Sequence, residues 1–295
     1  MITSIIFSKN RPLQLDLCLS SIAKNFPDSS QIIVIHNNDP AFDEAHNVLC
    51  QEHSHIESWK QSSSIFNDVS IATLGAKNDY ICFFTDDCMV YREVPFTTSE
   101  IIKLFHDPMS DTSGHELKIA CISLRLGTNT TLRYYGDGQH PALDNLPVKV
   151  KSDGMFLYWS RGSLPPGGYW SYPLSVDGHI FEKTHIALYC DELKMLDKIY
   201  RWKQTPNEFE AKLQRFYFEL PIMMASPTES CVVNSPNNRV QDSHQNRSGD
   251  FFAYDSKFLL DKYITGHRIN LEDLNFNDIR TPHTEINLIE GLYVK

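Results

Sequence analysis

An α/β fold with a mostly parallel central sheet is the fold class that the sequence predicts, on three observations. Short apolar runs have the length and composition of strands buried on both faces, at residues 2–7, 31–35 and 80–84. Segments with apolar residues at helical spacing follow or precede these runs, at residues 13–25, 43–52 and 65–74. Each run also ends in a polar cluster. Strands that alternate with helices in this way form parallel sheets with right-handed crossovers.

The elements of the N-terminal part can be justified in chain order. The first strand breaks at residues 8–12, and Pro12 suits the first position of the following helix because a proline has a fixed φ and no N–H to satisfy. The second strand ends in the polar residues 36–40. Residues 54–59 are a candidate for a short strand, and the helix at 65–74 leads directly into the strand at 80–84.

The pattern changes after Tyr91, and the remaining elements are more scattered. Ser99 is expected near the N-cap of the next helix. Residues 128–150 are polar and turn-rich, and the Gly/Pro/aromatic segment 165–170 cannot be a regular helix. Helices are expected at residues 99–106, 184–202, 207–216 and 255–263, and strands at 118–125 and 230–234. No polar linker separates independent units, so we expect one domain over 1–295 with two halves, 1–95 and 96–295.

Composition and charge exclude several classes of partner. The formal net charge is −10 and no basic block stands out, which disfavours nucleic acid and anionic membranes. The seven cysteines are odd in number, show no CxxC spacing and lie mostly in apolar runs, as in a reducing compartment. The first residues lack the pattern of a signal peptide, and no apolar stretch approaches the roughly 20 residues of a membrane span. We therefore expect a cytoplasmic protein with no integral membrane segment.

The most informative feature is a pair of adjacent carboxylates, Asp86 and Asp87, directly after the apolar run 80–84. The carboxyl end of a strand in an open α/β sheet borders the crevice where ligands bind. Two adjacent acids repel each other, so a positive group is expected beside them, and Mg²⁺ or Mn²⁺ suits hard oxygen ligands. An Asp pair after a strand is also compatible with an ordinary turn or helix cap.

Three blocks of the N-terminal third resemble the GT-A glycosyltransferases of family 2 type. The blocks are the strand, loop and helix from Ser4 to Ile22, the strand and polar turn at 31–39, and the run at 80–87 that ends in the acid pair. This resemblance implies a GT-A, Rossmann-like fold in which helices flank the sheet. Residues 1–95 would be the nucleotide-sugar-binding half, and residues 96–295 the acceptor-side half with a C-terminal extension.

The resemblance also implies a donor, a metal and roles for the acid pair. The donor would be a nucleotide-diphosphate sugar, with UDP as the expected nucleotide, and Mn²⁺ or Mg²⁺ would neutralise the departing diphosphate. Asp86 would contact the ribose and Asp87 would bind the metal. Cys88 stands where many members have a third acid, which weakens the expected metal affinity and leaves the need for a metal open.

Further residues are carried over to the nucleoside and the diphosphate. Ser8, Asn10 and Arg11 follow the first strand and would meet the nucleoside, although they can equally form a strand-to-helix turn. Asn37 stands where members have a base-binding Asp, and an amide both donates and accepts hydrogen bonds. An ordinary turn Asn is the alternative there. Asp68 is a further candidate for the base or ribose, with a surface helix position as its alternative.

The acceptor half supplies the remaining candidates. Glu208 occupies the family's base position at the start of a helix, whose dipole favours an ionised carboxylate, with Glu210 two residues on. Glu208 can equally be a helix-capping residue. Asp177 is expected to contact donor sugar or acceptor. The polar segment after residue 231 offers His244 as a second metal ligand and Arg239 and Arg247 as diphosphate partners, unless it is a solvated loop.

The predicted function is therefore an inverting, metal-dependent transfer of a sugar to a hydroxyl of a glycan or lipid-linked acceptor, in the synthesis of a surface polysaccharide. A nucleotidyltransferase is one alternative, although residues 7–14 contain no glycine to cradle a triphosphate. A non-catalytic carbohydrate-binding protein on a degenerate glycosyltransferase fold is the other.

Overall fold

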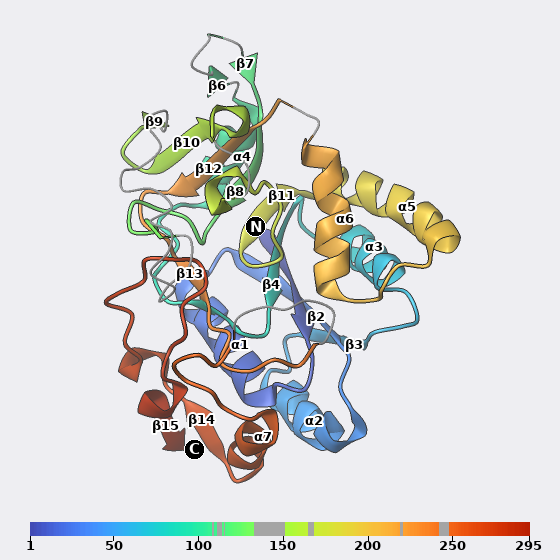
Figure 1. Ribbon diagram of the computed structural model, residues 1–295, viewed down its shortest axis with the longest axis vertical. Helices are drawn as coiled ribbons and strands as arrows, with labels where there is room; N and C mark the ends of the chain where they lie inside the picture. Colours follow the sequence, from blue (N-terminus) through green and yellow to red (C-terminus); the bar gives the residue numbers. More distant parts are fainter. Residues whose placement is uncertain are drawn as a thin grey trace.

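A nine-stranded mixed sheet organises the molecule, in the order β3-β2-β1-β4-β11-β8-β12-β10-β9 (Figure 1). The computed structural model describes residues 1–107, 109–110, 114, 116–132, 151–164, 168–218, 221–241 and 248–295. Strands from both halves of the sequence take part in this one sheet. The pairings make β3, β2, β1, β4, β8, β12 and β9 run in one direction and β11 and β10 in the other.

The N-terminal part confirms the predicted alternation of strand and helix. Its strands are β1 (Ile2–Ser8), β2 (Ser29–His36), β3 (Glu57–Lys60) and β4 (Tyr80–Thr85), and neighbouring ones pair in parallel. The helices are α1 (Pro12–Asn25), α2 (Asp43–Glu52) and α3 (Ile65–Gly75). Pro12 is the first residue of α1, as expected. The strand order brings the carboxyl ends of β1, β2 and β4 together at one edge.

The second half of the sheet contains strands that the sequence patterns did not reveal. β11 (His179–Glu182) runs antiparallel between β4 and β8 (Ile119–Ser123). β12 (Met223–Pro227) pairs in parallel with β8, and β10 (Phe156–Ser160) and β9 (Lys151–Ser152) complete the edge. β11 has only four residues and runs directly into the next helix, so its pattern merges with the helical one. The mostly parallel sheet that the sequence predicts is thus confirmed, with β11 and β10 as its antiparallel strands.

Helices cover both faces of the sheet, and side chains alternate between two hydrophobic cores. One core joins Ile2 and Ile6 of β1 to α1, α4 (Thr98–His106) and α7 (Ser256–Ile264). The other joins Ile5 and Phe7 to α3, α5 (Lys183–Tyr200) and α6 (Pro206–Phe218). Figure 1 shows α3, α5 and α6 grouped on one side of the sheet, with α1 and α7 together elsewhere. Period-two alternation along a strand buried on both faces produces this arrangement.

Smaller pairs of strands lie outside the main sheet. They are β5 (Cys88–Val90) with β13 (Val232–Asn234), β14 (His267–Ile269) with β15 (Leu292–Val294), and β6 (Met109–Ser110) with β7 (Glu116–Leu117). The β5–β13 pair matters for the site, because it places Asn234 opposite Cys88, next to the acid pair.

The start of helix α4 and the state of the cysteines can be compared with the sequence predictions. Ser99 lies near the N-cap of α4 as expected, and the cap itself is Thr97, in a capping box with Glu100, which stands three residues later and reaches back to the Thr97 N–H. All seven cysteines are free thiols, as expected, and Cys50 alone among them is not buried. In the described part of the chain, none of the helices combines the length and the apolar character that crossing a membrane requires.

Candidate active site

A cavity of about 760 Å³ opens at the carboxyl ends of β1, β2 and β4. Ser8 at the end of β1 and Lys9 after it line the cavity, Asn37 lines it after β2, and Asp86 and Asp87 line it after β4. The far wall comes from the second half of the chain, from residues 168–177, the start of α6 and the loops after β8 and β13. The cavity therefore lies where open α/β sheets bind ligands, and it is large enough for a small-molecule substrate.

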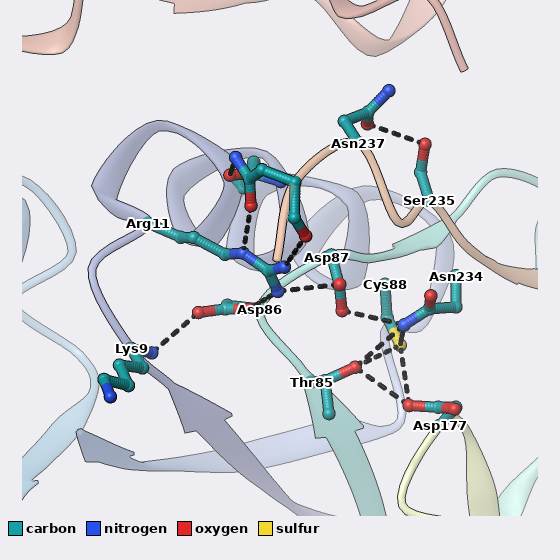
Figure 2. Close-up of polar contacts among 12 residues, drawn as sticks. Lys9, Arg11, Thr85, Asp86, Asp87, Cys88, Asp177, Asn234, Ser235 and Asn237 are labelled. Carbon is teal, nitrogen blue, oxygen red and sulfur yellow. Dashed lines mark hydrogen bonds and ion pairs between the residues drawn. The ribbon is translucent and has the colours of Figure 1, made fainter. Parts of the chain in front are cut away.

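The positive group expected beside the acid pair is the guanidinium of Arg11 (Figure 2). Its Nη1 atom lies 2.8 Å from Oδ1 of Asp86 and 2.7 Å from Oδ2 of Asp87. Arg11 is the N-cap residue of α1, so the turn between β1 and α1 carries the guanidinium across to the end of β4. We call Asp86 and Asp87 the β4 acids.

Every carboxylate oxygen of the β4 acids accepts an N–H hydrogen bond. The backbone N–H of Lys9 donates to Oδ2 of Asp86 at 2.8 Å, and Nδ2 of Asn234 donates to Oδ1 of Asp87 at 2.7 Å. Arg11 is itself held from the other side, because Nε donates to Oδ1 of Asn238 at 2.6 Å and Nη2 to the Asn238 carbonyl at 2.5 Å. The acids and the arginine thus form a closed hydrogen-bonded unit.

Burial and charge act against each other in this unit. Burial raises the pKa of Asp86 to about 6, although Arg11 beside it opposes this rise. Burial alone would lower the pKa of Arg11, but the carboxylates of Asp87 and Asp86 hold it above its usual value. The guanidinium is therefore charged at any accessible pH.

The donor set around the β4 acids does not fit a divalent cation as it stands. Mg²⁺ and Mn²⁺ need carboxylate lone pairs directed at the ion, whereas Arg11, Lys9 and Asn234 direct N–H groups at these oxygens. Within the described residues, no group of three His, Cys, Asp or Glu side chains is arranged to hold a metal. The expected metal ligand Asp87 thus faces a guanidinium.

A second set of acids stands farther along the cavity wall. Asp177 accepts from Oγ1 of Thr85 at 2.8 Å and from Nη1 of Arg125 at 3.2 Å. Gly178 follows with a φ of 82°, a left-handed conformation that side chains rarely adopt, and its N–H donates to the Phe83 carbonyl at 2.6 Å. This turn places Asp177 at the end of β4.

Glu210 on α6 lies in the same cavity wall, and we call Asp177 and Glu210 the second acid pair. The Oε1 atom of Glu210 accepts from the Tyr172 hydroxyl at 2.6 Å, and its Oε2 atom accepts from the Val176 N–H at 2.9 Å. Burial, followed by the charge of Asp177, raises the pKa of Glu210 to about 7. A carboxyl group with this pKa takes up and releases a proton near neutral pH.

Arg125 connects the second acid pair to two aromatic rings. Its Nη1 lies 3.2 Å from Nε2 of His283, and its guanidinium lies over the Tyr169 ring, 5.3 Å from the centroid. Since a guanidinium only donates, Nε2 of His283 is the acceptor and the ring proton lies on Nδ1. The rings of Tyr169 and His283 stack with centroids 5.5 Å apart. Flat aromatic faces in a cavity wall are suited to the C–H face of a sugar ring.

Most of the predicted site residues that the structure describes meet at this cavity. Ser8, Arg11, Asn37 and Arg239 line it. The three aspartates Asp86, Asp87 and Asp177 do so too. His244 and Arg247 lie outside the described residues, so their roles stay predictions.

Glu208, the expected base, does not line the cavity. It forms an ion pair with Lys212, one turn along α6, at 3.0 Å. Residues two apart on a helix point about 200° apart, so Glu208 and Glu210 cannot face the same cavity. The carboxylate that α6 presents to the cavity is therefore that of Glu210.

Asn10 and Asp68 form hydrogen bonds within the protein, and neither lines the cavity. Asn10, with a φ of 55°, donates through Nδ2 to Asp39 at 2.6 Å and accepts from the Asp39 N–H at 2.8 Å. Asp68 in the first turn of α3 accepts from the N–H and hydroxyl of Ser62 at 2.7 and 2.6 Å. Both residues fix loops beside the cavity.

Sequence reasoning missed Arg125, His283 and the amides Asn234 and Asn238. A signal existed for Arg125, which follows the buried strand β8 by two residues and so lies at the same sheet edge as the β4 acids. Asn234 ends a short strand, but only the β5–β13 pairing brings it to Asp87. His283 arrives through a C-terminal loop that meets Asn234 in an isolated bridge, and no local pattern marks it.

No family model and no curated protein match this chain. Among solved structures, S. aureus TarS 1-349 in complex with UDP shares 14% identity over 76% of this chain and 57% of that chain, with a TM-score of 0.43. A cytidylyltransferase from Leptospira borgpetersenii shares 11% over 80% of this chain and 82% of that chain, with a TM-score of 0.38. The galactosyltransferase LgtC with donor and acceptor sugar analogues shares 10% over 73% and 70%, also at 0.38. These modest scores assign no residue a role here, and the chain spans little more than half of TarS 1-349.

Proposed function

We propose that this protein is a glycosyltransferase that moves a sugar from a nucleotide-diphosphate sugar to a hydroxyl group of an acceptor. One observation carries the proposal. A single cavity at the carboxyl ends of the parallel strands joins charged, fixed acids after β4 to a carboxylate on α6 whose pKa is about 7. Sugar transfer needs both parts, since a donor must be held in place and an acceptor hydroxyl must lose a proton.

The donor nucleoside would lie over the loops after β1 and β2. Ser8 and the exposed Asn37 line this end of the cavity, and the Asn37 N–H donates to the Ser8 carbonyl at 2.9 Å, which holds the two loops together. Only the backbone of Asn37 makes this contact between the loops, so its side-chain amide can face a nucleobase. UDP is the nucleotide that the family resemblance favours.

The transfer step would use Glu210 as its general base. The acceptor oxygen attacks the anomeric carbon while the bond from this carbon to the diphosphate oxygen breaks, and its electron pair leaves with the nucleoside diphosphate. The acceptor proton passes to Glu210. A single displacement of this kind inverts the anomeric configuration. The rings of Tyr169 and Tyr172, which also line the cavity, would hold the sugar that receives the new bond.

The acceptor would be a glycan or a lipid-linked sugar, in the synthesis of a surface polysaccharide. This part of the proposal follows from the sequence resemblance and from the size of the cavity, which at about 760 Å³ takes a donor sugar together with one acceptor ring. The donor sugar would be selected by the wall between Asp177 and Tyr169.

A binding screen followed by product analysis tests the proposal. Purified protein is titrated calorimetrically with UDP-, GDP- and dTDP-sugars, and the tightest donor is then incubated with a panel of hydroxyl acceptors. We expect one nucleotide class to bind and its sugar to be transferred or slowly hydrolysed. Absence of donor binding and transfer across the panel would favour a non-catalytic carbohydrate-binding protein. Pyrophosphate release from a nucleoside triphosphate and a sugar phosphate would instead identify a nucleotidyltransferase.

A further inference from the structure

We propose that the donor diphosphate binds in this cavity without a divalent metal, because the Arg11 guanidinium permanently occupies the place between Asp86 and Asp87. This inference rests on the proposed function and reverses the expectation of Mn²⁺ or Mg²⁺ that the sequence resemblance raised. The group that lies between the two carboxylates is the Arg11 guanidinium.

A single nitrogen atom of Arg11 contacts both acids. Nη1 of Arg11 lies 2.8 Å from an Asp86 oxygen and 2.7 Å from an Asp87 oxygen, so it takes one oxygen from each acid (Figure 2). A metal bridging the β4 acids would need the same two oxygens and the same space. Placing a dication against a guanidinium at contact distance is opposed by like-charge repulsion in a site with little solvent.

The anchoring of Arg11 also matters, because a mobile arginine could simply make room. The side chain is 9% exposed, and Asn238 binds it through both its side chain and its carbonyl. Asn238 is in turn held, since its Nδ2 donates to the Tyr254 carbonyl at 3.0 Å. Moving Arg11 away would leave these acceptors and two nearly buried carboxylates without their donor.

The remaining oxygens of Asp86 and Asp87 also accept hydrogen bonds. The Lys9 N–H occupies Oδ2 of Asp86 and the Asn234 amide occupies Oδ1 of Asp87, so the outer lone pairs also face donors. Cys88, at the position of a third acid in many family members, is buried and its thiol contacts Thr85 and Asp177. The neighbourhood of Asp87 is thus built to satisfy carboxylates with N–H groups.

The diphosphate then needs cations of its own, since two acids and one guanidinium leave one negative charge uncompensated. Lys9 and Arg239 both line the cavity; the Lys9 N–H holds Asp86, and Arg239 follows Asn238, which holds Arg11. Their charges would stabilise the diphosphate as the bond to the anomeric carbon breaks and its electrons move to the phosphate oxygen. No proton or metal is needed for this electron movement to balance.

Titration of wild-type protein with UDP is the deciding experiment. It is run in EDTA, in Mg²⁺ and in Mn²⁺, after correction for the metal that UDP binds in solution. We expect the Kd to agree within about twofold in all three buffers, whereas a metal-dependent site would bind at least about tenfold more tightly with Mn²⁺. Tenfold tightening in Mn²⁺ would overturn the inference and leave the proposed function intact. Failure of UDP, GDP and dTDP to bind in every buffer would refute the proposed function itself.

Mn²⁺ alone, followed by electron paramagnetic resonance, provides a readout that is independent of nucleotide and of activity. We expect no protein-bound Mn²⁺ in wild type or in Arg92→Ala, a control that removes an ion-paired arginine outside the cavity. Arg11→Ala should bind Mn²⁺, because it uncovers the β4 acids. Bound Mn²⁺ in wild type would overturn the inference. If Arg11→Ala does not fold, the wild-type measurements decide alone.

Discussion

The β4 acids and the second acid pair line one cavity, yet their surroundings differ in one respect that decides their chemistry. Asp86 and Asp87 share a single arginine nitrogen and accept N–H groups at every oxygen. In the second pair, Arg125 reaches Asp177 alone, and Glu210 has a tyrosine hydroxyl and one backbone N–H.

This difference separates binding from proton transfer. A carboxylate fixed against a guanidinium is favoured in its ionised form and holds its position, which suits recognition of a donor. A carboxyl group with neutral donors, partly removed from water and next to another acid, keeps a pKa of about 7 and can exchange its proton. The number of arginine contacts to each acid therefore predicts which acid binds and which one reacts.

Glu210→Gln is expected to have the largest effect. It removes the only proton acceptor that we assign, so the transfer rate should fall by roughly 10²–10⁴-fold while donor affinity changes little. Initial rates at saturating donor, together with calorimetric titration of the donor, measure the two quantities. Glu208→Gln is the matched control, because Glu208 lies on the same helix but outside the cavity, and it should stay within about twofold of wild type. The reverse ranking of the two variants would restore Glu208 as the base.

Arg11→Met tests the other side of the comparison through stability. Two nearly buried carboxylates would lose their cation, and breaking a buried ion pair in this way typically costs about 3–5 kcal/mol. Urea denaturation of Arg11→Met should show this loss. Neutralising the acids as well, with Asp86→Asn and Asp87→Asn, should restore part of it. A loss below about 1 kcal/mol would mean that the pairing is no stronger than a surface salt bridge.

The pH dependence should report the titration of Glu210, with a pKa of about 7, just above the range in which Asp86, with a pKa of about 6, titrates. The Glu210 carboxyl group has an ordinary pKa of 4.5 and one of about 7 in the folded protein, so between these values the folded state keeps a proton that the unfolded state releases. This contribution to stability is complete below pH 4.5 and is lost as the pH rises to 7, by at most roughly 3 kcal/mol, less the part screened at a partly exposed side chain.

Two profiles measured together check this prediction. The transfer rate of wild type should rise with pH toward and above 7, as Glu210 loses its proton. The melting temperature of wild type should fall relative to that of Glu210→Gln over the same range. Parallel melting profiles for the two proteins would show that Glu210 titrates normally and is unsuited to be the base.

Asn37→Ala should have the smallest effect. The Asn37 side chain is exposed and is expected to touch only the nucleobase, so donor affinity should fall by about tenfold or less with no change in stability. Calorimetric titration of the donor measures this, and Asp68→Asn, outside the cavity, is the control. An equal loss of affinity in Asp68→Asn would place the nucleoside elsewhere.

The sequence predicted the parallel half of the fold more fully than the mixed half. Runs such as 80–84 are apolar throughout, as strands buried on both faces must be, and the helices between them are periodic. β11 was not predicted, because a strand of four residues that is followed directly by a helix is too short to show an alternating hydrophobic pattern. Its direction depends on the neighbouring strands, β4 and β8, which no local pattern specifies.

The site was predictable where it follows strand ends and not where it depends on distant pairing. Asp86, Asp87, Ser8 and Asn37 stand directly after buried runs, and all line the cavity. The partner of the acid pair was expected to be a metal, because the contact between Arg11 and residues 75 and 76 positions away has no signature in sequence. Glu208 was preferred over Glu210 because family position, rather than the face of the helix, decided between them.

The reciprocal hydrogen bonds between Asn10 and Asp39 have a kinetic consequence. They lock the loop after β1 to the loop after β2, and Asn10 adds a third bond to the Asn38 side chain at 2.8 Å. A nucleotide would therefore meet a surface that is already ordered, and association should need no slow rearrangement of these loops. Different nucleotides should then arrive at similar rates, and preference among them should appear as differences in residence time.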